Sequence, residues 1–188
     1  MNIILIRHGE SEHNSGITIL KDTPLTKKGV VQAKFLGKKL KRQKIKINKI
    51  YTSNLIRSKQ TGEIISKIIH IPIKSSLEEL DEYASKNLKS RIRILFNLRL
   101  RKLKKFLKEL SIDKERNKNI LIIAHGVTNR IIMGYLLQIP LKKQLLRFRQ
   151  HNTGLSVLYW NKNFKNWCLE SMNDMPHLPK KLRSINKS

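Results

Sequence analysis

Two histidines in this chain follow apolar runs of the same kind. Residues 3–9 read I-I-L-I-R-H-G and residues 120–126 read I-L-I-I-A-H-G, so His8 and His125 each stand between an apolar run and a glycine. Arg7 directly precedes the first histidine. A guanidinium binds phosphate bidentately and keeps its charge, and an imidazole beside it can attack phosphorus. The pairing of Arg7 with His8 therefore predicts a site for a phosphorylated anion.

Other residues could complete such an anion site. Arg57 falls in the first turn of a helix that we expect Ser53 or Asn54 to cap, and a helix N-terminus attracts phosphate through its free N–H groups. Asn14 and the backbone N–H of Gly126 could add donors. A positive shell of this kind would stabilise the oxygens of a phosphoryl group under attack.

A phosphoryl-transfer site also needs an acid. The alkoxide that leaves a phosphomonoester must take up a proton, which calls for a carboxylic acid near the cations. Residues 78–82 read E-E-L-D-E and form the only dense acidic cluster of the sequence. We expect the proton donor to lie in this cluster.

Several other chemistries lack their motifs. The sequence contains no H-E-x-x-H and no cluster of cysteine and histidine, which argues against a metal site. It has no G-x-G-x-x-G, no G-x-x-x-x-G-K-[ST] and no G-x-S-x-G. We therefore expect neither a metal ion nor a cofactor.

The elements that must position these residues alternate between strand and helix. Apolar runs predict strands, and steps of three and four predict amphipathic helices. The expected strands are residues 3–7, 49–52, 119–124, 155–160 and 167–170, and the expected helices are residues 27–40, 54–69, 89–110 and 127–137. This order predicts an α/β fold, a three-layer sandwich with a mostly parallel central sheet flanked by helices. Ligands of such folds bind at the carboxyl ends of the strands, where His8 and His125 are expected.

The composition sets broader limits. A chain of 188 residues suits one domain, and its 40 Lys and Arg against 13 Asp and Glu give a net charge of +27. That charge would attract anionic substrates or a nucleic acid or other polyanion, or it reflects only a lysine-rich usage. The single cysteine, Cys168, and the absence of a long apolar run predict a cytoplasmic protein that does not contact a membrane. Residues 179–188 are basic and aperiodic, so we expect a flexible tail there.

Residues 5–14, L-I-R-H-G-E-S-E-H-N, resemble the R-H-G-[EQ]-[ST]-x-x-N signature of the histidine phosphatase superfamily, the phosphoglycerate-mutase-like group. Further segments resemble the motifs of this family in the right order: residues 25–33 (L-T-x-x-G-x-x-Q-A), 53–61 (S-x-L-x-R-x-x-Q-T), 77–79 (L-x-E), 124–126 (A-H-G) and 173–178 (N-x-x-x-H-L). The resemblance covers residues 1–178, which we expect to form a single domain with the phosphoglycerate-mutase-like fold.

The resemblance implies a role for each candidate. His8 would be the nucleophile that becomes phosphohistidine, and Arg7, Arg57 and His125 would hold the phosphoryl group. Glu79 would be the proton donor. Because the segment after the acid, residues 83–86, lacks the glycine common in the family, the choice between Glu79 and Glu82 stays open. Asn14 and Gly126 would help to bind phosphate, and the group uses no metal.

We therefore expect a phosphatase that hydrolyses a small phosphate monoester through a phosphohistidine on His8. A cofactor-dependent phosphoglycerate mutase is the first alternative, although the resemblance implies a longer insertion after the acid in such mutases. A non-catalytic, polyanion-binding protein on the same fold is the second, with the basic stretch 86–108 as its binding surface; otherwise this stretch is a solvated helix face. The sequence leaves the substrate and the oligomeric state open, a homodimer included.

Overall fold

The sheet that carries the candidate residues has six strands. The computed structural model describes residues 1–83, 90–113, 117–141, 143 and 148–184. The strands are β1 (Asn2–Arg7), β2 (Lys49–Ser53), β3 (Ile73–Leu77), β4 (Asn119–Ala124), β5 (Leu155–Asn161) and β6 (Asn166–Asp174), in the spatial order β3-β2-β4-β1-β5-β6. The first four strands in space are parallel, and β5 and β6 run antiparallel at one edge. The expected mostly parallel sheet is confirmed.

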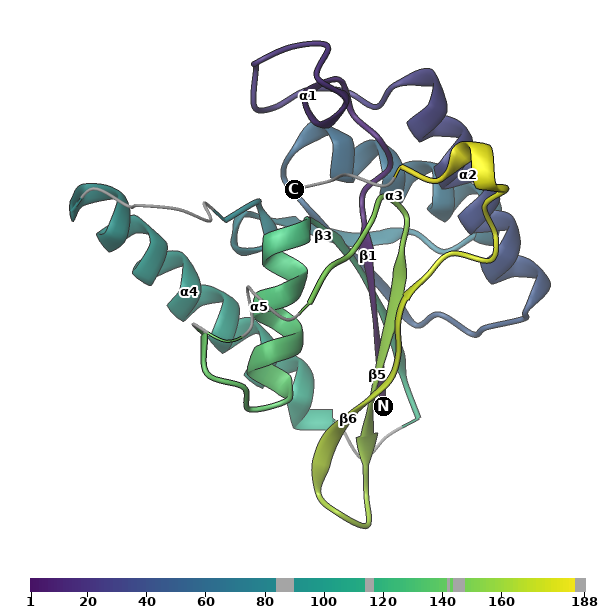
Figure 1. The fold of residues 1–188 in the computed structure, drawn as a ribbon. Coiled ribbons are helices and arrows are strands. Elements are labelled where there is room, and N and C mark those ends of the chain that lie inside the picture. The colour runs from purple at the N-terminus through teal and green to yellow at the C-terminus, as the bar shows by residue number, and fades with distance from the viewer. Residues whose placement is uncertain (84–89, 114–116, 142, 144–147, 185–188) are drawn as a thin grey trace.

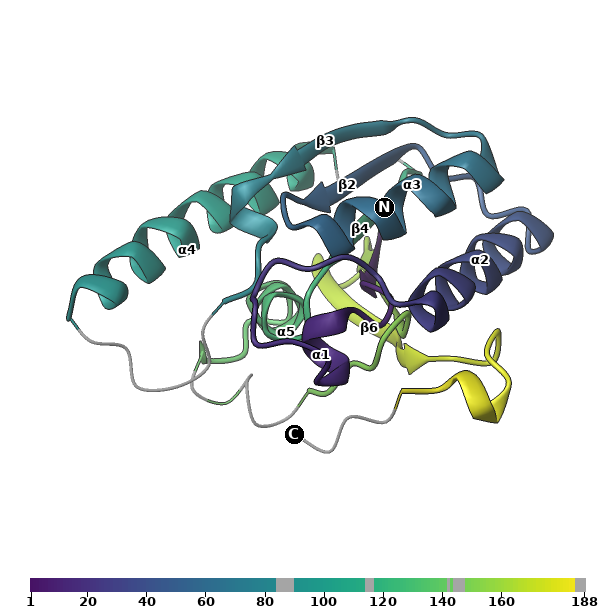
Figure 2. The same ribbon diagram turned by 90° about the horizontal axis from the view of Figure 1, so that it is seen from above.

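Helices cover both faces of this sheet. The helices are α1 (Glu12–Ser15), α2 (Lys27–Arg42), α3 (Ile56–Ile69), α4 (Ser90–Leu110) and α5 (Gly126–Leu136), with 3-10 turns η1 (Glu78–Leu80), η2 (Ser111–Asp113) and η3 (Lys180–Leu182). Figures 1 and 2 show α2 and α3 on one face of the sheet and α4 and α5 on the other. The expected three-layer α/β sandwich is therefore confirmed.

The strand β1 shows why its apolar run is continuous. Ile3 and Leu5 belong to the core beneath α4 and α5, whereas Ile4 and Ile6 belong to the core beneath α2 and α3. A strand at the centre of a covered parallel sheet buries both faces, so every position is apolar. The run ends at Arg7, where the strand reaches the edge of both cores.

The register between β1 and β4 places the two histidines together. The two strands are parallel, and Arg7 pairs with Ala124. The residues that follow the two strands are His8 and His125, and the N–H of His8 donates to the carbonyl of Ala124 at 3.0 Å. Both histidine turns thus leave the sheet side by side at its carboxyl end.

The strand β3 has no counterpart among the expected elements. Its sequence, I-K-S-S-L, is apolar only at its ends, and it pairs with β2 alone. An edge strand is held by one neighbour and needs no apolar run, so hydrophobic patterning does not reveal it.

The described part of the expected tail is attached to the domain. The Gln32 side chain donates to the carbonyl of Leu182 at 2.6 Å and to the Ser184 hydroxyl at 3.0 Å. Ser184 in turn donates to the carboxylate of Glu10 at 2.6 Å and is 5% exposed. Residues 179–184 thus pack against the start of α2, whereas residues 185–188 lie outside the described residues.

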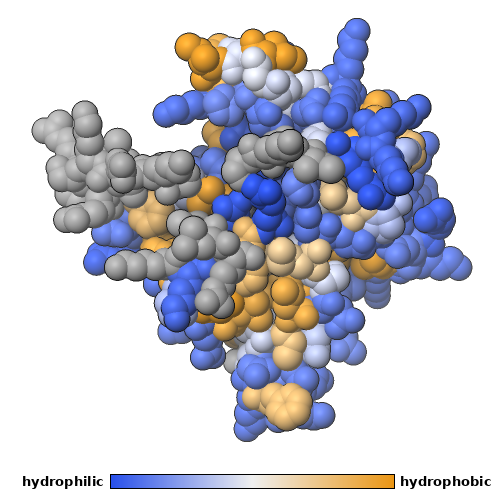
Figure 3. Space-filling view, viewed as in Figure 1, coloured by the Kyte–Doolittle hydropathy of each residue, from blue (hydrophilic) through white to orange (hydrophobic). Residues whose placement is uncertain are grey.

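The described surface is mostly polar. Figure 3 shows a face that is hydrophilic except for two gatherings of apolar side chains, one below the centre and one at the top over the loop that follows α1, where Ile17, Ile19 and Leu20 are exposed. In the described part of α4, Arg99 is half-buried and the other basic side chains are exposed; Lys102 pairs with Glu78 across 3.3 Å. No helix within the described ranges combines the length and the apolarity that a bilayer span requires.

Candidate active site

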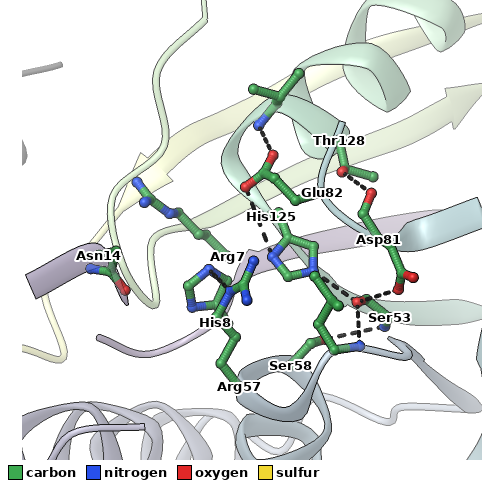
Figure 4. Close-up of polar contacts among 12 residues, drawn as sticks. Arg7, His8, Asn14, Ser53, Arg57, Ser58, Asp81, Glu82, His125 and Thr128 are labelled. Atoms are coloured by element: carbon green, nitrogen blue, oxygen red, sulfur yellow. Dashed lines mark hydrogen bonds and ion pairs between the residues drawn. The ribbon is translucent and has the colours of Figure 1, made fainter. Parts of the chain in front are cut away.

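The two histidine rings lie next to each other at the carboxyl ends of β1 and β4. Their centroids are 4.9 Å apart, and the planes are inclined by 57°. His8 is 1% exposed and His125 is completely buried. Figure 4 shows both rings between the guanidinium groups of Arg7 and Arg57 and the carboxylate of Glu82.

Hydrogen bonds define the free nitrogen of His8. Its Nδ1 lies 2.6 Å from the carbonyl oxygen of Gly9, which can only accept, so Nδ1 carries the proton. The lone pair of Nε2 accepts from Nε of Arg57 at 3.1 Å. Burial, followed by the charges of Arg7 and Arg57, holds the pKa of His8 well below its usual range. The imidazole is therefore neutral, with the lone pair of Nε2 toward Arg57.

Arg57 is a buried cation and Arg7 a half-buried one, and backbone carbonyls fix both. Arg7 donates from Nη1 to the carbonyl of Gln150 at 3.0 Å, and Arg57 donates from Nη1 to the carbonyl of Lys21 at 2.7 Å. Burial lowers both arginine pKa values, and the charge of Glu82 opposes this effect. The buried Nε of Arg7 has no hydrogen-bond partner among the described residues. A buried donor without a partner indicates room for an anion.

The start of α3 differs from the expected cap. Its N-cap residue is Leu55, which supplies no side-chain hydrogen bond. The carboxylate of Asp22 instead accepts from the N–H of Ile56 at 2.8 Å and lies 4.0 Å from Nη1 of Arg57. The hydroxyl of Ser53 lies 2.8 Å from Nε2 of His125. Ser53 thus contacts the second histidine rather than capping the helix.

Of the two candidate acids, the structure brings Glu82 to the histidines. Its Oε2 lies 3.9 Å from Nδ1 of His125, and its Oε1 accepts from the N–H of Val127, in the first turn of α5, at 3.0 Å. Glu79 lies on η1, half-buried, and its backbone carbonyl accepts from the Tyr83 hydroxyl at 3.2 Å. Among the described residues, the carboxylate of Glu79 takes part in no hydrogen bond or ion pair.

The surroundings of Glu82, whose side chain is 32% exposed, act on its pKa in both directions. Burial raises its pKa, while the charge of Arg7, the N–H of Val127 and the charges of Arg57 and Arg130 work in the opposite direction. The net shift is upward, as a general acid requires. A sequence signal for this residue does exist, since L-x-E occurs twice within the acidic segment, at residues 77–79 and again at residues 80–82.

Asn14 and Gly126 lie at the edge of the site. The side-chain oxygen of Asn14 accepts from the N–H and the hydroxyl of Ser11 at 2.6 and 2.7 Å, in a capping box at α1. Its amide group donates to the side chain of Asn152 at 3.2 Å. Gly126 is the first residue of α5, and a Cβ built on it would lie 3.8 Å from the Arg7 guanidinium. Asn14 is thus linked through Asn152 to the carbonyl of His8, and Gly126 lies beside Arg7.

A polar segment before β5 supports the first histidine turn, and the sequence analysis does not include it. Gln150 donates to the carbonyl of Leu5 at 2.9 Å, and Asn152 donates to the carbonyl of His8 at 3.0 Å. The N–H of Thr153 donates to the carbonyl of Arg7 at 2.9 Å. These bonds join residues more than 140 positions apart, so no local pattern predicts them.

The described residues of the site do not form a set of metal ligands. Within the described ranges, no group of three or more histidine, cysteine, aspartate or glutamate side chains is arranged to hold a metal ion. The unpartnered atoms of the site are instead a buried guanidinium Nε on Arg7 and Nδ1 of His125. Together with the N-terminus of α5, they suit an anion with several oxygens.

Comparison with known proteins agrees with this chemistry. The chain is 28% identical over 207 aligned residues to the "Probable phosphoglycerate mutase GpmB" of Photorhabdus laumondii, and the alignment covers 95% of each protein. Among solved structures, it superimposes on the alpha-ribazole phosphatase of Shigella flexneri with a TM-score of 0.73 and 20% identity, covering 93% of this chain and 97% of the other.

A second structure with the same fold is a phosphoserine phosphatase mutant of Entamoeba histolytica in complex with phosphoserine. Its TM-score is 0.72 and its identity 22%, and the superposition covers 95% of this chain and 99% of the other. The sequence profile of the histidine phosphatase superfamily (branch 1) matches residues 3–92 and 99–175, which include the two histidine turns, Arg57 and Glu82. The chain therefore belongs to the histidine phosphatase superfamily, as the resemblance of its motifs implied.

Proposed function

We propose that this protein is a phosphatase that hydrolyses small phosphate monoesters through a phosphohistidine on Nε2 of His8, without a metal ion or a cofactor. One observation carries the proposal. The Gly9 carbonyl holds the proton of His8 on Nδ1, which leaves the lone pair of Nε2 facing the cationic site. A neutral nitrogen nucleophile beside two fixed guanidinium groups matches what phosphoryl transfer requires.

In the first step the substrate phosphoryl group displaces the Arg57 Nε from the His8 lone pair. The two arginines bind its oxygens together with His125 and the N-terminus of α5, whose first residue, Gly126, lies beside Arg7. Nε2 forms a bond to phosphorus while the bond from phosphorus to the ester oxygen breaks. Glu82 gives its proton to that oxygen, so the product leaves as an alcohol and Glu82 becomes a carboxylate.

In the second step water replaces the alcohol. The Glu82 carboxylate takes a proton from the water, whose oxygen attacks phosphorus while the bond to Nε2 breaks. Inorganic phosphate leaves, and Glu82 is again a carboxylic acid. The raised pKa of Glu82 suits both halves of this cycle, because the group gives and then recovers one proton.

The same residues would serve a phosphoglycerate mutase, so the argument for hydrolysis comes from the segment after the acid. Residues 83–118 join Glu82 to β4 and consist mostly of α4. The resemblance implies a longer insertion at this place in mutases, so the shortness of this segment in the sequence favours hydrolysis. The solved structures with this fold include a phosphoserine phosphatase bound to phosphoserine, which supports a small phosphorylated substrate. A cytoplasmic location remains part of the proposal.

The test is phosphate release from a panel of phosphomonoesters in the presence of EDTA and without bisphosphoglycerate. We expect the intact protein to release phosphate, and we expect His8→Ala to release none. Acid-labile, alkali-stable labelling of the intact protein by a ³²P-labelled substrate would identify the phosphohistidine. Transfer between the positions of phosphoglycerate, seen only after bisphosphoglycerate is added, would instead establish the mutase. Polyanion binding without either reaction, unchanged in His8→Ala, would overturn both.

A further inference from the structure

We infer that Ser53 and Asp81 form a positioning relay behind His125. The relay fixes which nitrogen of that ring carries its proton and stabilises the charged ring when a phosphoryl group is bound. The inference rests on the proposed function for its consequences in catalysis, but its first part concerns the unliganded protein alone.

The relay is visible in the hydrogen bonds of the buried Ser53 hydroxyl. Its Oγ lies 2.8 Å from Nε2 of His125 and 2.8 Å from Oδ1 of Asp81 (Figure 4). The N–H of Leu55 also donates to it at 3.0 Å. A carboxylate only accepts, so the hydroxyl proton points to Asp81, and the remaining lone pair of Ser53 faces His125. His125 must therefore donate from Nε2, which leaves Nδ1 without a proton in the neutral ring.

Asp81 is held in place from three directions. Its Oδ1 also accepts from the N–H of Asn54 at 2.7 Å, between β2 and α3. Its carbonyl accepts from Thr128 Oγ1 of α5 at 2.8 Å and from Arg99 Nη2 of α4 at 2.6 Å. The Arg99 guanidinium also lies 4.3 Å from the centroid of the Tyr83 ring. A carboxylate fixed in this way can set the orientation of the Ser53 hydroxyl and, through it, of the His125 ring.

The relay matters because Nδ1 is the nitrogen that faces the site. It has no hydrogen-bond partner among the described residues, and Oε2 of Glu82 is 3.9 Å away. A bare lone pair would repel the oxygens of a phosphoryl group, so Nδ1 must take up a proton before it can bind one. His125 then becomes an imidazolium with two donors, one toward Ser53 and one toward the substrate.

Several groups around His125 oppose this charge in the empty site. Burial and the neighbouring positive groups hold its pKa well below its usual range. The groups that face it are Arg7 at the end of β1, His8 directly after it, Arg57 from α3, Arg99 from α4 and Glu82 before α4, with Asp81 behind Ser53. An incoming phosphoryl group offsets the positive groups in front of the ring, and Asp81 supplies negative charge behind it.

A substrate that enters as the monoanion brings the required proton itself. The phosphoryl O–H bond breaks, the proton binds Nδ1, and the phosphoryl group becomes a dianion that the imidazolium holds. Glu82 keeps its own proton for the leaving group. The two acidic residues that are adjacent in sequence thus have separate roles, Asp81 behind the histidine and Glu82 in front of it.

The first experiment measures the tautomer of His125 in the unliganded protein by ¹⁵N NMR of labelled histidine, assigned with His125→Gln. We expect the proton on Nε2 in the intact protein and in Ser53→Thr, and a mixture of tautomers in Ser53→Ala. Ser76→Ala is the matched control, because Ser76 is hydrogen-bonded to Thr52 at 2.8 Å on the neighbouring strand and has no contact with the relay. A proton on Nδ1 of the intact protein, or no change in Ser53→Ala, would overturn the inference.

The second experiment separates the charge of the relay from its geometry. Asp81→Asn keeps an acceptor oxygen for Ser53 but removes the negative charge. With saturating inorganic phosphate, we expect His125 to be an imidazolium in the intact protein and neutral in Asp81→Asn at the same pH. Phosphomonoester hydrolysis should fall on the order of tenfold to a hundredfold, the range found when the partner behind a metal-bound histidine is removed.

Two results would contradict this second part: an imidazolium in phosphate-bound Asp81→Asn at the same pH, or a rate equal to that of Ser76→Ala. If the intact protein hydrolyses no phosphomonoester, the proposed function fails, and the tautomer measurement then decides the relay by itself. Thermal unfolding of each variant separates loss of the fold from loss of the relay.

Discussion

The two histidine turns have nearly the same sequence but opposite hydrogen bonding. In the β1 turn the proton of His8 lies on Nδ1, because the adjacent Gly9 carbonyl accepts from it. In the β4 turn the proton of His125 lies on Nε2, because Ser53 accepts from it across 72 positions of the chain. His8 therefore presents a lone pair on Nε2 to the site, whereas His125 presents Nδ1.

This difference teaches that the role of each ring is set by its partner and not by the strand-His-Gly pattern. In the proposed mechanism, a local partner, the next carbonyl, allows His8 to act as the nucleophile, and a distant partner prepares His125 to bind the phosphoryl group. The turns also continue differently, since Gly126 begins α5 whereas Gly9 packs against the backbone of Gly29 at the start of α2.

The largest effects on hydrolysis should come from replacing the two histidines one at a time. We expect His8→Ala to abolish hydrolysis and the phosphoenzyme, a loss on the order of 10⁴-fold or more. We expect His125→Ala to lose about 10²- to 10³-fold, the size of removing one stabilising donor, and to form the phosphoenzyme slowly. Rapid-quench labelling with a ³²P-labelled substrate measures both. A labelled protein from His8→Ala, with none from His125→Ala, would reverse the two roles.

The next effect concerns the acid that lies in front of His125. We expect Glu82→Gln to slow hydrolysis about 10²- to 10⁴-fold for an alkyl phosphate, because the leaving oxygen then receives no proton. The loss should be smaller for p-nitrophenyl phosphate, whose leaving group needs less protonation. Glu79→Gln is the matched control and should act like the intact protein. If Glu79→Gln were the slower variant with the alkyl phosphate, the assignment to Glu82 would be wrong.

The pH profile of kcat/KM should show the ionisations of His8 and Glu82. Hydrolysis requires His8 without its second proton, and the pKa of His8 is lowered, so the acid limb of kcat/KM should lie below the ordinary histidine range. It also requires protonated Glu82, whose pKa is raised, so the alkaline limb should lie above the ordinary glutamate range. The two limbs together give a bell with an acidic optimum. Glu82→Gln should remove the alkaline limb, after correction for ionisation of the substrate; its persistence would assign that limb to another group.

How far the sequence predicts this site depends on the range of the interactions. The apolar runs before His8 and His125 are local signals of buried parallel strands, and the ordered motifs were sufficient to identify the fold. The edge strand β3 has no such run, and its position depends on pairing with β2 alone. The hydrogen-bond partners of the two histidines differ in the same respect. The Gly9 carbonyl is next to His8 in the sequence, whereas Ser53 is far from His125.

The acid shows a second limit. Two L-x-E triplets follow each other directly in residues 77–82, and only the course of the chain through η1 decides which carboxylate turns inward. Arg99 from α4 contributes to that course, because it donates to the carbonyls of Asp81 and Glu82 at 2.6 and 3.3 Å. These bonds span 17 and 18 positions, beyond the reach of a three-residue pattern.

The smallest expected effect is a difference in stability between alanine substitutions of Gly9 and Gly126, the two glycines that follow the histidines. A Cβ on Gly9 would lie 2.6 Å from the Gly29 carbonyl oxygen, and because that neighbour is backbone, the turn or the start of α2 must move. We expect Gly9→Ala to lower the free energy of unfolding by about 1–3 kcal/mol. A Cβ on Gly126 meets nothing closer than the Arg7 guanidinium at 3.8 Å, and alanine restricts the unfolded chain, so Gly126→Ala should change this free energy by no more than about 1 kcal/mol.

Urea denaturation of both variants measures this difference directly. Equal losses would mean that the two turns are equally constrained, and the contrast between them would then be confined to their hydrogen bonds. Unequal losses in the expected order would show a mechanical contrast as well: the turn of His8 is wedged between its own strand and α2, so the carbonyl that fixes its proton cannot shift. The turn of His125 has room beside Arg7, and its ring depends on Ser53 for its orientation.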